Sequence, residues 1–364
     1  MKGTIATPKS SEYLGKDQLT ILIPTFNGEA TIGRALSSVI FDIESNELQN
    51  LVKVIIIDNC STDSTNKIVR KIAVDRSYIQ IHKTKSNVGL DGNLRIGVGL
   101  VSSKFVKILC DDDLVIPGYI PNLLLIIKAN PDADLVVSSM QAFRENKSEL
   151  IQRNPIAVNR FFNTSEFIET TKGAYGQLST LSFKVISWLE SEGSPLLQNY
   201  NHHNMEFVAR VYHLAIKGVC IFDDSQLMEN DIGPKRWNNS YFDVFKVNCS
   251  HTLFVFQLDS LNQNEFPNIR TWQNWINVSK KSMSRRLLID IIGLRSIGKS
   301  VRDESVWKYV PIPIKNNKYL HLFVKAVDLM PTSICKLMIR IEFLQRLFLG
   351  MVMHARSILF SKHP

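Results

Sequence analysis

The sequence predicts an α/β fold, with a mainly parallel central sheet flanked by helices and a C-terminal helical extension. In the first part of the chain, short and almost continuously apolar runs alternate with stretches of helical periodicity, whereas from about residue 236 aromatic and basic helical segments follow without strands. Strands that are apolar on both faces are typical of parallel sheets covered by helices. With 364 residues, of which 45% are hydrophobic, the chain can bury the core that such a sheet needs.

Two strand–loop–helix units open the chain. Residues 19–24, LTILIP, form an apolar run that ends in proline, and apolar residues at helical spacing follow the turn TFNGEA. Residues 51–58, LVKVIIID, form a second run, followed by the turn NCSTDS and another helical stretch. Short β-branched runs bounded by turn residues predict buried strands, and apolar residues three or four positions apart predict helices.

Three more strands are expected further along the chain. The run YIQIHK at residues 78–83 and the run FVKILC at residues 105–110 are separated by the loop SNVGLDGN and a helical stretch. The fifth strand, DLVVSSMQAF at residues 134–143, follows the helical segment GYIPNLLLIIKA. Parallel strands need crossover connections, and this alternation supplies them as helices.

A polar cluster follows each of the first four strands. The clusters are TFNGE, DNCSTD, SNVGLDGN and DDD, in chain order. In open parallel sheets, ligands bind at the carboxyl ends of the strands. The sequence therefore predicts that the four clusters gather at one edge of the sheet and form one site.

Three consecutive aspartates, Asp111, Asp112 and Asp113, follow the fourth strand. Asp111 and Asp113 are two residues apart, so we expect both on the same side of the chain as ligands of Mn²⁺ or Mg²⁺, with Asp112 turned toward the turn or solvent. A divalent cation would also relieve the repulsion between these charges. The alternative is a solvated turn of helix-capping aspartates. The position at a strand end, beside three other polar clusters, favours the metal site.

Asp58 ends the second strand and is expected to accept hydrogen bonds from a nucleoside, as carboxylates do at this position in dinucleotide folds. Its alternative role is to cap the following helix, for which Ser61 and Asp63 are better placed. Neither a G-x-G-x-x-G nor a G-x-x-x-x-G-K-[ST] pattern occurs at the expected place. A nucleotide is therefore expected to be held by side chains and metal.

These motifs resemble those of the family 2 glycosyltransferases. The segments LTILIPTFNGEATIGRALSSV, VKVIIIDNCSTDST, NVGLDGN and ILCDDDLVIPG are similar, in order and spacing, to the P-x-[YF]-N-x-E, D-[ND]-x-S-x-D-x-T and D-x-D patterns of that family. The segment NVGLDGN resembles the bacterial abequosyltransferase-like branch. The resemblance implies a GT-A fold and transfer of a hexosyl or deoxyhexosyl unit from a nucleotide-sugar with inversion.

The resemblance also implies roles for individual residues. Asp58 would bind the base, Asp111 would lie near ribose and metal, and Asp113 would ligate the metal directly. The predicted nucleotide-sugar-binding residues are Pro24, Thr25, Asn27, Glu29, Asp58, Asn87, Asp91, Asp111 and Asp112, and the predicted metal ligands are Asp111 and Asp113.

The general base of inverting transfer is the least well defined of these residues. The family supplies it in an E-D-x-[DE]-L-x-x-R pattern, which HNMEFVAR resembles only at Glu206 and Arg210. His203 and Asn204 stand where the acidic pair is expected. His203, or its neighbour His202, and Glu206 are the predicted catalytic candidates, because imidazole titrates near neutrality. The alternative is that all three lie on the polar face of a helix.

Three cations and one aromatic side chain have two interpretations each. Lys83, Lys85 and Arg95 flank the third loop and either contact a donor phosphate or remain solvated. Trp188 either stacks on an acceptor sugar or belongs to the core.

The predicted domain organisation has three parts. Residues 1–18 form an N-terminal tail, and residues 19–235 form the GT-A domain, with a nucleotide-sugar half at 19–143 and an acceptor half at 144–235. Residues 236–364 form a helical, basic C-terminal region.

The charge of that last region predicts its partner. The chain carries a net charge of +9, and from residue 315 onward eight basic residues face two acidic ones. An interfacial helix at the membrane and docking onto the catalytic domain are the two interpretations. No signal peptide or spanning segment is visible, and the five cysteines form no C-x-x-C pair. We expect a cytoplasmic protein, peripheral at the inner face of the cell membrane, that does not bind nucleic acid.

The leading functional hypothesis is therefore a metal-dependent glycosyltransferase acting on a glycan or lipid-linked acceptor in cell-surface polysaccharide or O-antigen-type synthesis. The missing E-D pair keeps open a catalytically degenerate GT-A protein that binds glycan or nucleotide. A sugar nucleotidyltransferase is the third hypothesis, although PTFNGEA is not the glycine-rich basic loop that such enzymes need.

Overall fold

The chain divides into two compact units. The first comprises residues 1–233 and 265–268, and the second comprises residues 234–264 and 269–364. The computed structural model describes residues 18–139, 141–143, 159–161, 166–167, 177–194, 197, 206–224, 228–231, 287, 289–300, 302–307 and 318–340.

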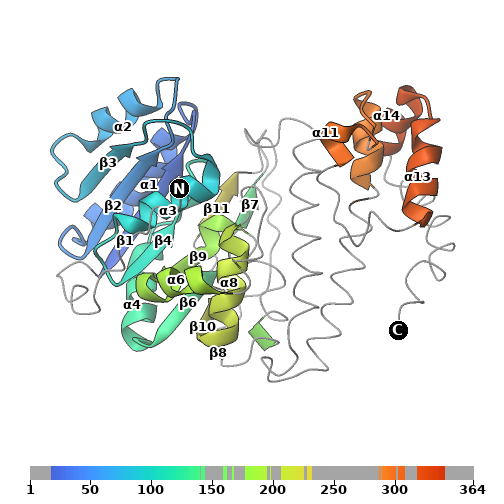
Figure 1. The fold of residues 1–364 in the computed structure, drawn as a ribbon. Coiled ribbons are helices and arrows are strands. Elements are labelled where there is room, and N and C mark those ends of the chain that lie inside the picture. Colours follow the sequence, from blue (N-terminus) through green and yellow to red (C-terminus); the bar gives the residue numbers. More distant parts are fainter. Residues whose placement is uncertain are drawn as a thin grey trace. The chain divides into compact units, whose positions relative to one another are not determined.

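An eight-stranded, mainly parallel sheet forms the centre of the first unit (Figure 1). Its order is β3-β2-β1-β4-β9-β6-β10-β8, and only β8 and β9 run antiparallel to their neighbours. The strands are β1 (Leu19–Thr25), β2 (Val52–Asp58), β3 (Ile79–Lys83), β4 (Phe105–Ile108), β6 (Ala133–Ser138), β8 (Asn159–Phe161), β9 (Leu181–Lys184) and β10 (Val219–Asp223). The predicted α/β class is confirmed, and β2 to β4 fall within the predicted runs, while β1 extends one residue beyond its run, to Thr25.

A second, three-stranded sheet interrupts the predicted fifth strand. Residues 134–143 are expected to form one strand, but the structure has β6 to Ser138 and then β7 (Gln141–Phe143) in another sheet. That sheet has the order β5-β11-β7, with β5 (Leu114–Val115) and β11 (Met228–Asp231). The apolar run therefore changes sheets between β6 and β7.

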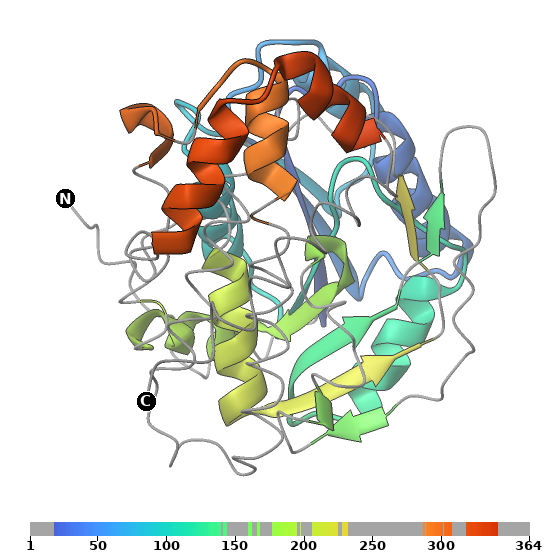
Figure 2. The same cartoon turned by 90° about the vertical axis from the view of Figure 1, so that its right-hand side faces the viewer.

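Helices cover both faces of the large sheet, as strands apolar on both faces require. They are α1 (Ile32–Ser45), α2 (Thr65–Ala73), α3 (Gly89–Gly99), α4 (Tyr119–Ala129), α6 (Val185–Glu190) and α8 (Glu206–Lys217), with the 3₁₀ turns η3 (Leu178–Thr180) and η4 (Ser191–Gly193). Helices α1 and α4 contribute to one apolar core with alternate residues of β1 and β2. Figure 2 shows α4 and α8 on opposite sides of β6 and β10.

Helix α3 packs closely on the face opposite to α1. A Cβ atom at Gly97 would lie 2.9 Å from both Leu22 methyl carbons and 3.3 Å from Ile57. Glycine therefore permits the close approach of α3 to β1 and β2, which fixes where the N-terminus of α3 meets the carboxyl edge of the sheet.

The regular secondary structure described in the second unit is helical. It contains helical residues 289–296, α11 (Glu304–Trp307), α13 (Lys318–Asp328) and α14 (Thr332–Arg340). Its buried apolar side chains include Ile292, Leu294, Val306, Val327 and Cys335. None of the helices in the described ranges is long and apolar enough to cross a membrane.

Candidate active site

The carboxyl ends of β1, β2 and β3 lie in register at one edge of the large sheet. Thr25 pairs with Asp58, and Asp58 pairs with Lys83. Strand β4 runs parallel to β1 on its other side, and the backbone N–H of Leu109 donates to Leu22 at 3.0 Å. The structure thus brings the four predicted polar clusters to the same edge.

Asp111 is held against the end of β1. The Thr25 hydroxyl donates a hydrogen bond to Asp111 Oδ2, and both side chains are buried. This bond joins the first cluster to the aspartates. It also orients the Asp111 carboxylate toward β1.

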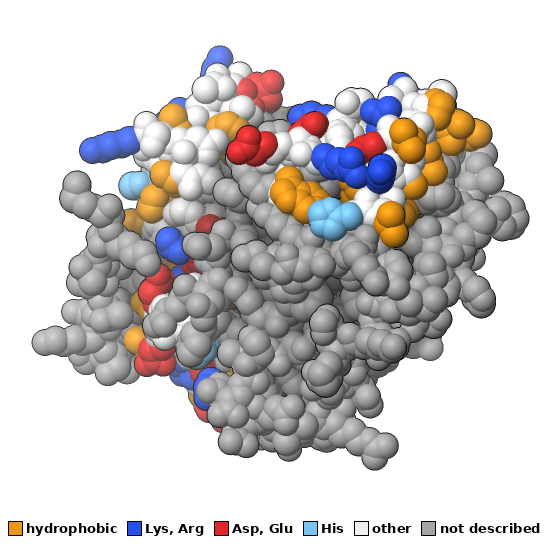
Figure 3. All heavy atoms as spheres, turned by 45° about the vertical axis from the view of Figure 1, so that its right-hand side comes forward, with side chains coloured by type: hydrophobic (Ala, Val, Ile, Leu, Met, Phe, Trp, Pro, Cys, Tyr) orange, Lys and Arg blue, Asp and Glu red, His pale blue; other side chains and the backbone are white. Residues whose placement is uncertain are grey.

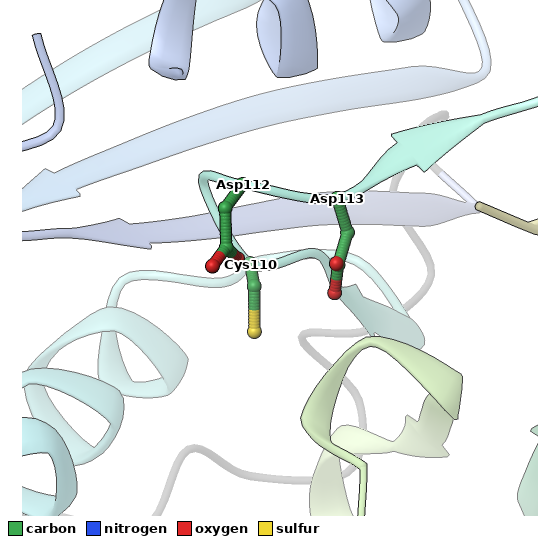
Figure 4. Close-up of side chains that lie close together, drawn as sticks. All are labelled: Cys110, Asp112 and Asp113. Atoms are coloured by element: carbon green, nitrogen blue, oxygen red, sulfur yellow. The ribbon is translucent and has the colours of Figure 1, made fainter. Parts of the chain in front are cut away.

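Asp112 and Asp113 form a different group with Cys110. One ligand-type atom from each of the three side chains lies within 4.8 Å of the others (Figure 4). The backbone N–H of Asp113 donates to the carbonyl of Cys110 at 3.2 Å, so the segment turns tightly. In the structure Asp112 lies near Asp113 and a hydrogen bond from Thr25 holds Asp111 at β1, and a metal shared by Asp111 and Asp113 stays a prediction.

Ser179, which lies far from this turn in the sequence, forms hydrogen bonds to both Cys110 and Asp113. Its hydroxyl donates to Asp113 Oδ2 at 2.5 Å and accepts from the backbone N–H of Cys110 at 2.8 Å. Ser179 lies in η3, just before β9, and is buried. Ser179 could not be predicted as a site residue, because a 3₁₀ turn of LST carries no pattern that indicates a partner 66 residues away.

The donor set fits a hard divalent cation. Two adjacent carboxylates suit Mg²⁺ or Mn²⁺, which usually complete their coordination with water and substrate phosphate. Burial raises the pKa of the Cys110 thiol well above its usual value, and the carboxylates of Asp113 and Asp112 raise it further. A protonated thiol is a poor ligand. Asp112 and Asp113 therefore supply the oxygen ligands of this group, and ligation of a metal by Asp111 and Asp113 stays a prediction.

The loop after β1 is tied to the loop after β2. The Asn27 amide oxygen accepts from the backbone N–H of Thr62 at 2.9 Å, and Glu29 Oε2 accepts from that of Ser64 at 2.9 Å. The backbone N–H of Asn27 donates in return to Ser61 Oγ at 2.9 Å. Two predicted nucleotide-binding side chains thus shape the edge by cross-linking its loops. Pro24, the third predicted residue of this segment, lies buried within β1.

Asp58 is fully buried at the base of the second loop. Its Oδ1 accepts from the backbone N–H of Ser61 at 2.8 Å, and its Oδ2 accepts from Asn66 Nδ2 at 3.3 Å. Lys83 Nζ lies 3.7 Å from Oδ2 and donates to the Ser61 carbonyl at 2.8 Å. These bonds hold the second loop, and they give Lys83 protein partners. Base binding by Asp58 stays a prediction.

Asn87 and Asp91 belong to the third loop and the start of α3. Asn87 Oδ1 accepts from Asn59 Nδ2 at 2.9 Å, which joins the second and third loops. Asp91 Oδ1 accepts from the backbone N–H of Glu206, the first residue of α8, at 3.1 Å. In this structure Asp91 therefore contacts α8.

Of the predicted base candidates, only Glu206 lies in the described ranges. Arg95 and Arg210 both form ion pairs with the buried Glu206 carboxylate. Arg95 is thus bound to Glu206, while 48% of its side chain stays exposed to solvent. His202 and His203 lie outside the described residues.

Trp188 and Lys107 complete the surroundings of the site. Trp188 is buried, with its ring 3.9 Å from that of Phe183, so it belongs to the core.

Lys107 on β4 is fully buried and donates to the Ser179 carbonyl. Burial lowers the pKa of Lys107 to about 7, against the attraction of Asp113. The sequence analysis did not single out Lys107, although a lysine inside the apolar run FVKILC was the available signal.

Part of the chain is similar to known proteins. Residues 20–187 match the family model described as Glycosyl transferase family 2. The chain is similar to an uncharacterised glycosyltransferase of Haemophilus influenzae, with 25% identity over 133 residues, 36% of this chain and 40% of that protein. It is also similar to the GalNAc(5)-diNAcBac-PP-undecaprenol beta-1,3-glucosyltransferase of Campylobacter jejuni, with 28% identity over 108 residues, 29% of this chain and 33% of that protein. The chain thus spans less than half the length of either relative.

Solved structures share the fold. Residues 1–349 of S. aureus TarS in complex with UDP-GlcNAc superpose with a TM-score of 0.52 and 14% sequence identity, covering 85% of this chain and 88% of that one. The complex of the same protein with UDP gives a TM-score of 0.51 at 13% identity, with the same coverage. The predicted GT-A fold is confirmed. Residues 20–187, a little less than half of the chain, are thus similar to the glycosyl transferase family 2 domain.

Proposed function

We propose that the protein transfers a sugar from a nucleotide-sugar donor, with inversion, to a glycan or lipid-linked acceptor in cell-surface polysaccharide synthesis. The observation that carries the proposal is the pair Asp112–Asp113, which follows β4 at the carboxyl edge of a family 2 domain. Carboxylates at this edge meet the ligand in open α/β sheets. The glucosyltransferase named above and the UDP-GlcNAc bound to TarS support the substrate class.

The chain's own residues prepare the site for a diphosphate. Ser179 holds the Asp113 carboxylate, and Thr25 holds Asp111 beside it. A divalent cation held by Asp112 and Asp113 would supply Lewis-acid stabilisation of the charge that develops on the leaving diphosphate. Inversion also requires a base on the acceptor side, for which His203 remains the predicted residue.

A panel of UDP-, GDP-, dTDP- and CDP-sugars tests this proposal. Full-length protein with Mn²⁺ is expected to release nucleotide from one donor class, and Asp113→Asn is expected to lose that turnover and Mn²⁺-dependent donor binding while the fold stays intact. Asp132→Asn, at an exposed aspartate, is the matched control. Donor binding without turnover on any acceptor would instead favour a degenerate binding protein. Release of pyrophosphate from a nucleoside triphosphate and a sugar phosphate would indicate a nucleotidyltransferase.

The second unit offers a surface for a membrane-bound acceptor. On α13, α14 and the turn between them, Leu322, Leu329, Ile334 and Leu337 expose large apolar side chains (Figure 3). Lys325, Lys336 and other basic residues accompany them, whereas the carboxylate of Asp328 accepts from Ser300 Oγ at 2.8 Å. Apolar and basic side chains together suit an anionic lipid surface.

Vesicle sedimentation tests this contact. The full chain is expected to bind phosphatidylglycerol-containing vesicles and to leave them when Leu329→Ser and Leu337→Ser are combined. Leu125→Ser in α4 of the first unit is the matched control, because Leu125 is 65% exposed. Equal binding by the double variant would contradict the membrane proposal and leave docking of this surface on protein as the explanation.

A further inference from the structure

Five charged side chains join α3, α8 and the 3₁₀ turn η4. Asp91 and Arg95 lie one helical turn apart on α3, Glu206 and Arg210 lie one turn apart on α8, and Glu192 lies in η4. We call these five residues the α3–α8 cluster. Its members are separated by up to 119 positions in sequence, so the cluster fixes a contact that local structure cannot supply.

Glu206 occupies the centre of the α3–α8 cluster. Its Oε1 accepts from Arg95 Nε at 3.1 Å and from Arg210 Nε at 2.9 Å, and its Oε2 accepts from a terminal nitrogen of Arg95. Its backbone N–H donates to Asp91 Oδ1. Both carboxylate oxygens and the first N–H of α8 are therefore engaged by neighbouring side chains.

Arg210 is equally constrained on the other side of Glu206. It is 2% exposed, donates to the Trp188 carbonyl at 3.0 Å and to Ser191 Oγ at 2.9 Å, and pairs with Glu192. Its guanidinium carbon lies 5.3 Å from the centre of the Trp188 ring. A buried guanidinium with its partners arranged in this way has little freedom to release Glu206.

We infer that Glu206 is a positioning residue, which fastens the start of α8 to α3 through Arg95, and that the acceptor proton is taken by another group. The inference rests on the proposed function and deepens it. A general base needs an oxygen that can reach the acceptor hydroxyl. Each Glu206 oxygen instead accepts charge-assisted hydrogen bonds from guanidinium groups, which hold the carboxylate in place against α3 and α8.

Helices α3 and α8 both start close to residues that are predicted to take part in catalysis or donor binding. Helix α3 begins beside Asn87, whose side chain is bonded to the loop after β2 at the donor edge. Helix α8 begins at Glu206, directly after the HNM segment in which the base is predicted. The α3–α8 cluster therefore sets the register of α8 against the donor edge. Small errors in such a register reduce the rate of the chemical step strongly.

A double-mutant cycle tests the contact without any ligand. Full-length Glu206→Gln, Arg95→Met and the double variant are compared with wild type by urea unfolding. The two single effects are expected to be strongly non-additive, so the double variant unfolds at nearly the same urea concentration as the less stable single variant. The control cycle uses Glu44→Gln and Arg76→Met, a surface pair at 2.9 Å, for which additivity is expected. Additive effects for Arg95 and Glu206 would overturn the inference.

The pH dependence of donor turnover separates a positioning residue from a base. With the sugar-nucleotide panel and Mn²⁺, both single variants are expected to lose turnover by a similar factor, roughly 10- to 100-fold, without a shift in the acidic limb of the pH profile. Loss of that limb in Glu206→Gln, with full turnover in Arg95→Met, would make Glu206 the base and overturn the inference. If wild type turns over no donor, the proposed function fails, and the unfolding cycle alone then decides whether Glu206 fastens α8.

Discussion

Lys107 gives the protein a stability that depends on pH. Its side chain is fully buried on β4, donates to the Ser179 carbonyl and lies 5.0 Å from the centre of the Tyr119 ring. Burial lowers the pKa of Lys107 from its usual 10.5 to about 7, although Asp113 and Asp223 attract the ammonium. The folded protein therefore binds this proton less tightly than the unfolded chain.

The direction of this pH dependence follows from the difference between the pKa of Lys107 in the folded protein and in the unfolded chain. Above about pH 10.5 the lysine is neutral in both states, and below about pH 7 it is charged in both. Between these values the unfolded chain holds the extra proton, so the free energy of unfolding rises with pH. Over the whole range the free energy of unfolding rises by about 5 kcal/mol through Lys107, and about 1.5 kcal/mol of this rise falls between about pH 7 and about pH 8.5.

Urea unfolding of wild type and Lys107→Met at these two pH values, with EDTA present, measures this effect. The wild type is expected to gain about 1.5 kcal/mol more than the variant on going to the higher pH, because methionine has no proton to exchange. Burial also raises the pKa of Cys220, and ionisation of this thiol in the unfolded chain lowers the free energy of unfolding at high pH. Because wild type and variant share this contribution, it cancels when their free energies of unfolding are subtracted. A difference between wild type and variant that does not change with pH would refute the reasoning.

Three further predictions concern packing, capping and the metal. Gly97→Ala is expected to lower the free energy of unfolding by about 1–3 kcal/mol, because its Cβ would lie 2.9 Å from the Leu22 methyl groups; unchanged urea unfolding would contradict this close packing. Asp42→Asn is expected to lower the free energy of unfolding by about 1–2 kcal/mol, because the buried carboxylate accepts backbone N–H bonds at 2.6 and 2.7 Å at the start of α4; equal stability in urea would refute it. Ser179→Ala is expected to weaken Mn²⁺ binding by about 10-fold or more, because Asp113 loses the hydroxyl that orients it; an unchanged Mn²⁺ titration by electron paramagnetic resonance would contradict that role.

The first four strands could be predicted from the sequence because their signals are local. Each apolar run ends in turn residues, and the parallel register then brings Thr25, Asp58 and the aspartates to one edge. Strand β9 lies between β4 and β6 in space but follows them by more than forty residues in the chain. The four residues of β9, LSFK, include only two apolar side chains, which are too few to indicate such an insertion.

The details of the site depended on contacts that spacing does not encode. A period of two residues predicts Asp111 and Asp113 on one side, whereas the tight turn after β4 and the hydrogen bond from Thr25 to Asp111 could not be predicted from spacing. The bond between Arg95 and Glu206 spans 111 positions, so the sequence offered Glu206 as a base and Arg95 as a phosphate contact or solvated cation. Long-range partners such as these override what a motif implies about a single side chain.

Anomalous diffraction at the manganese edge, from crystals of the full chain grown with Mn²⁺ and UDP, tests the central claim most directly. The proposed function predicts one strong peak within coordination distance of Asp112 and Asp113, with the diphosphate of UDP on its other side and the uridine along the loops after β1 and β2. The same crystals of Asp113→Asn are expected to lose the peak. Uridine bound away from the carboxyl edge, or manganese bound by other residues, would contradict the proposal.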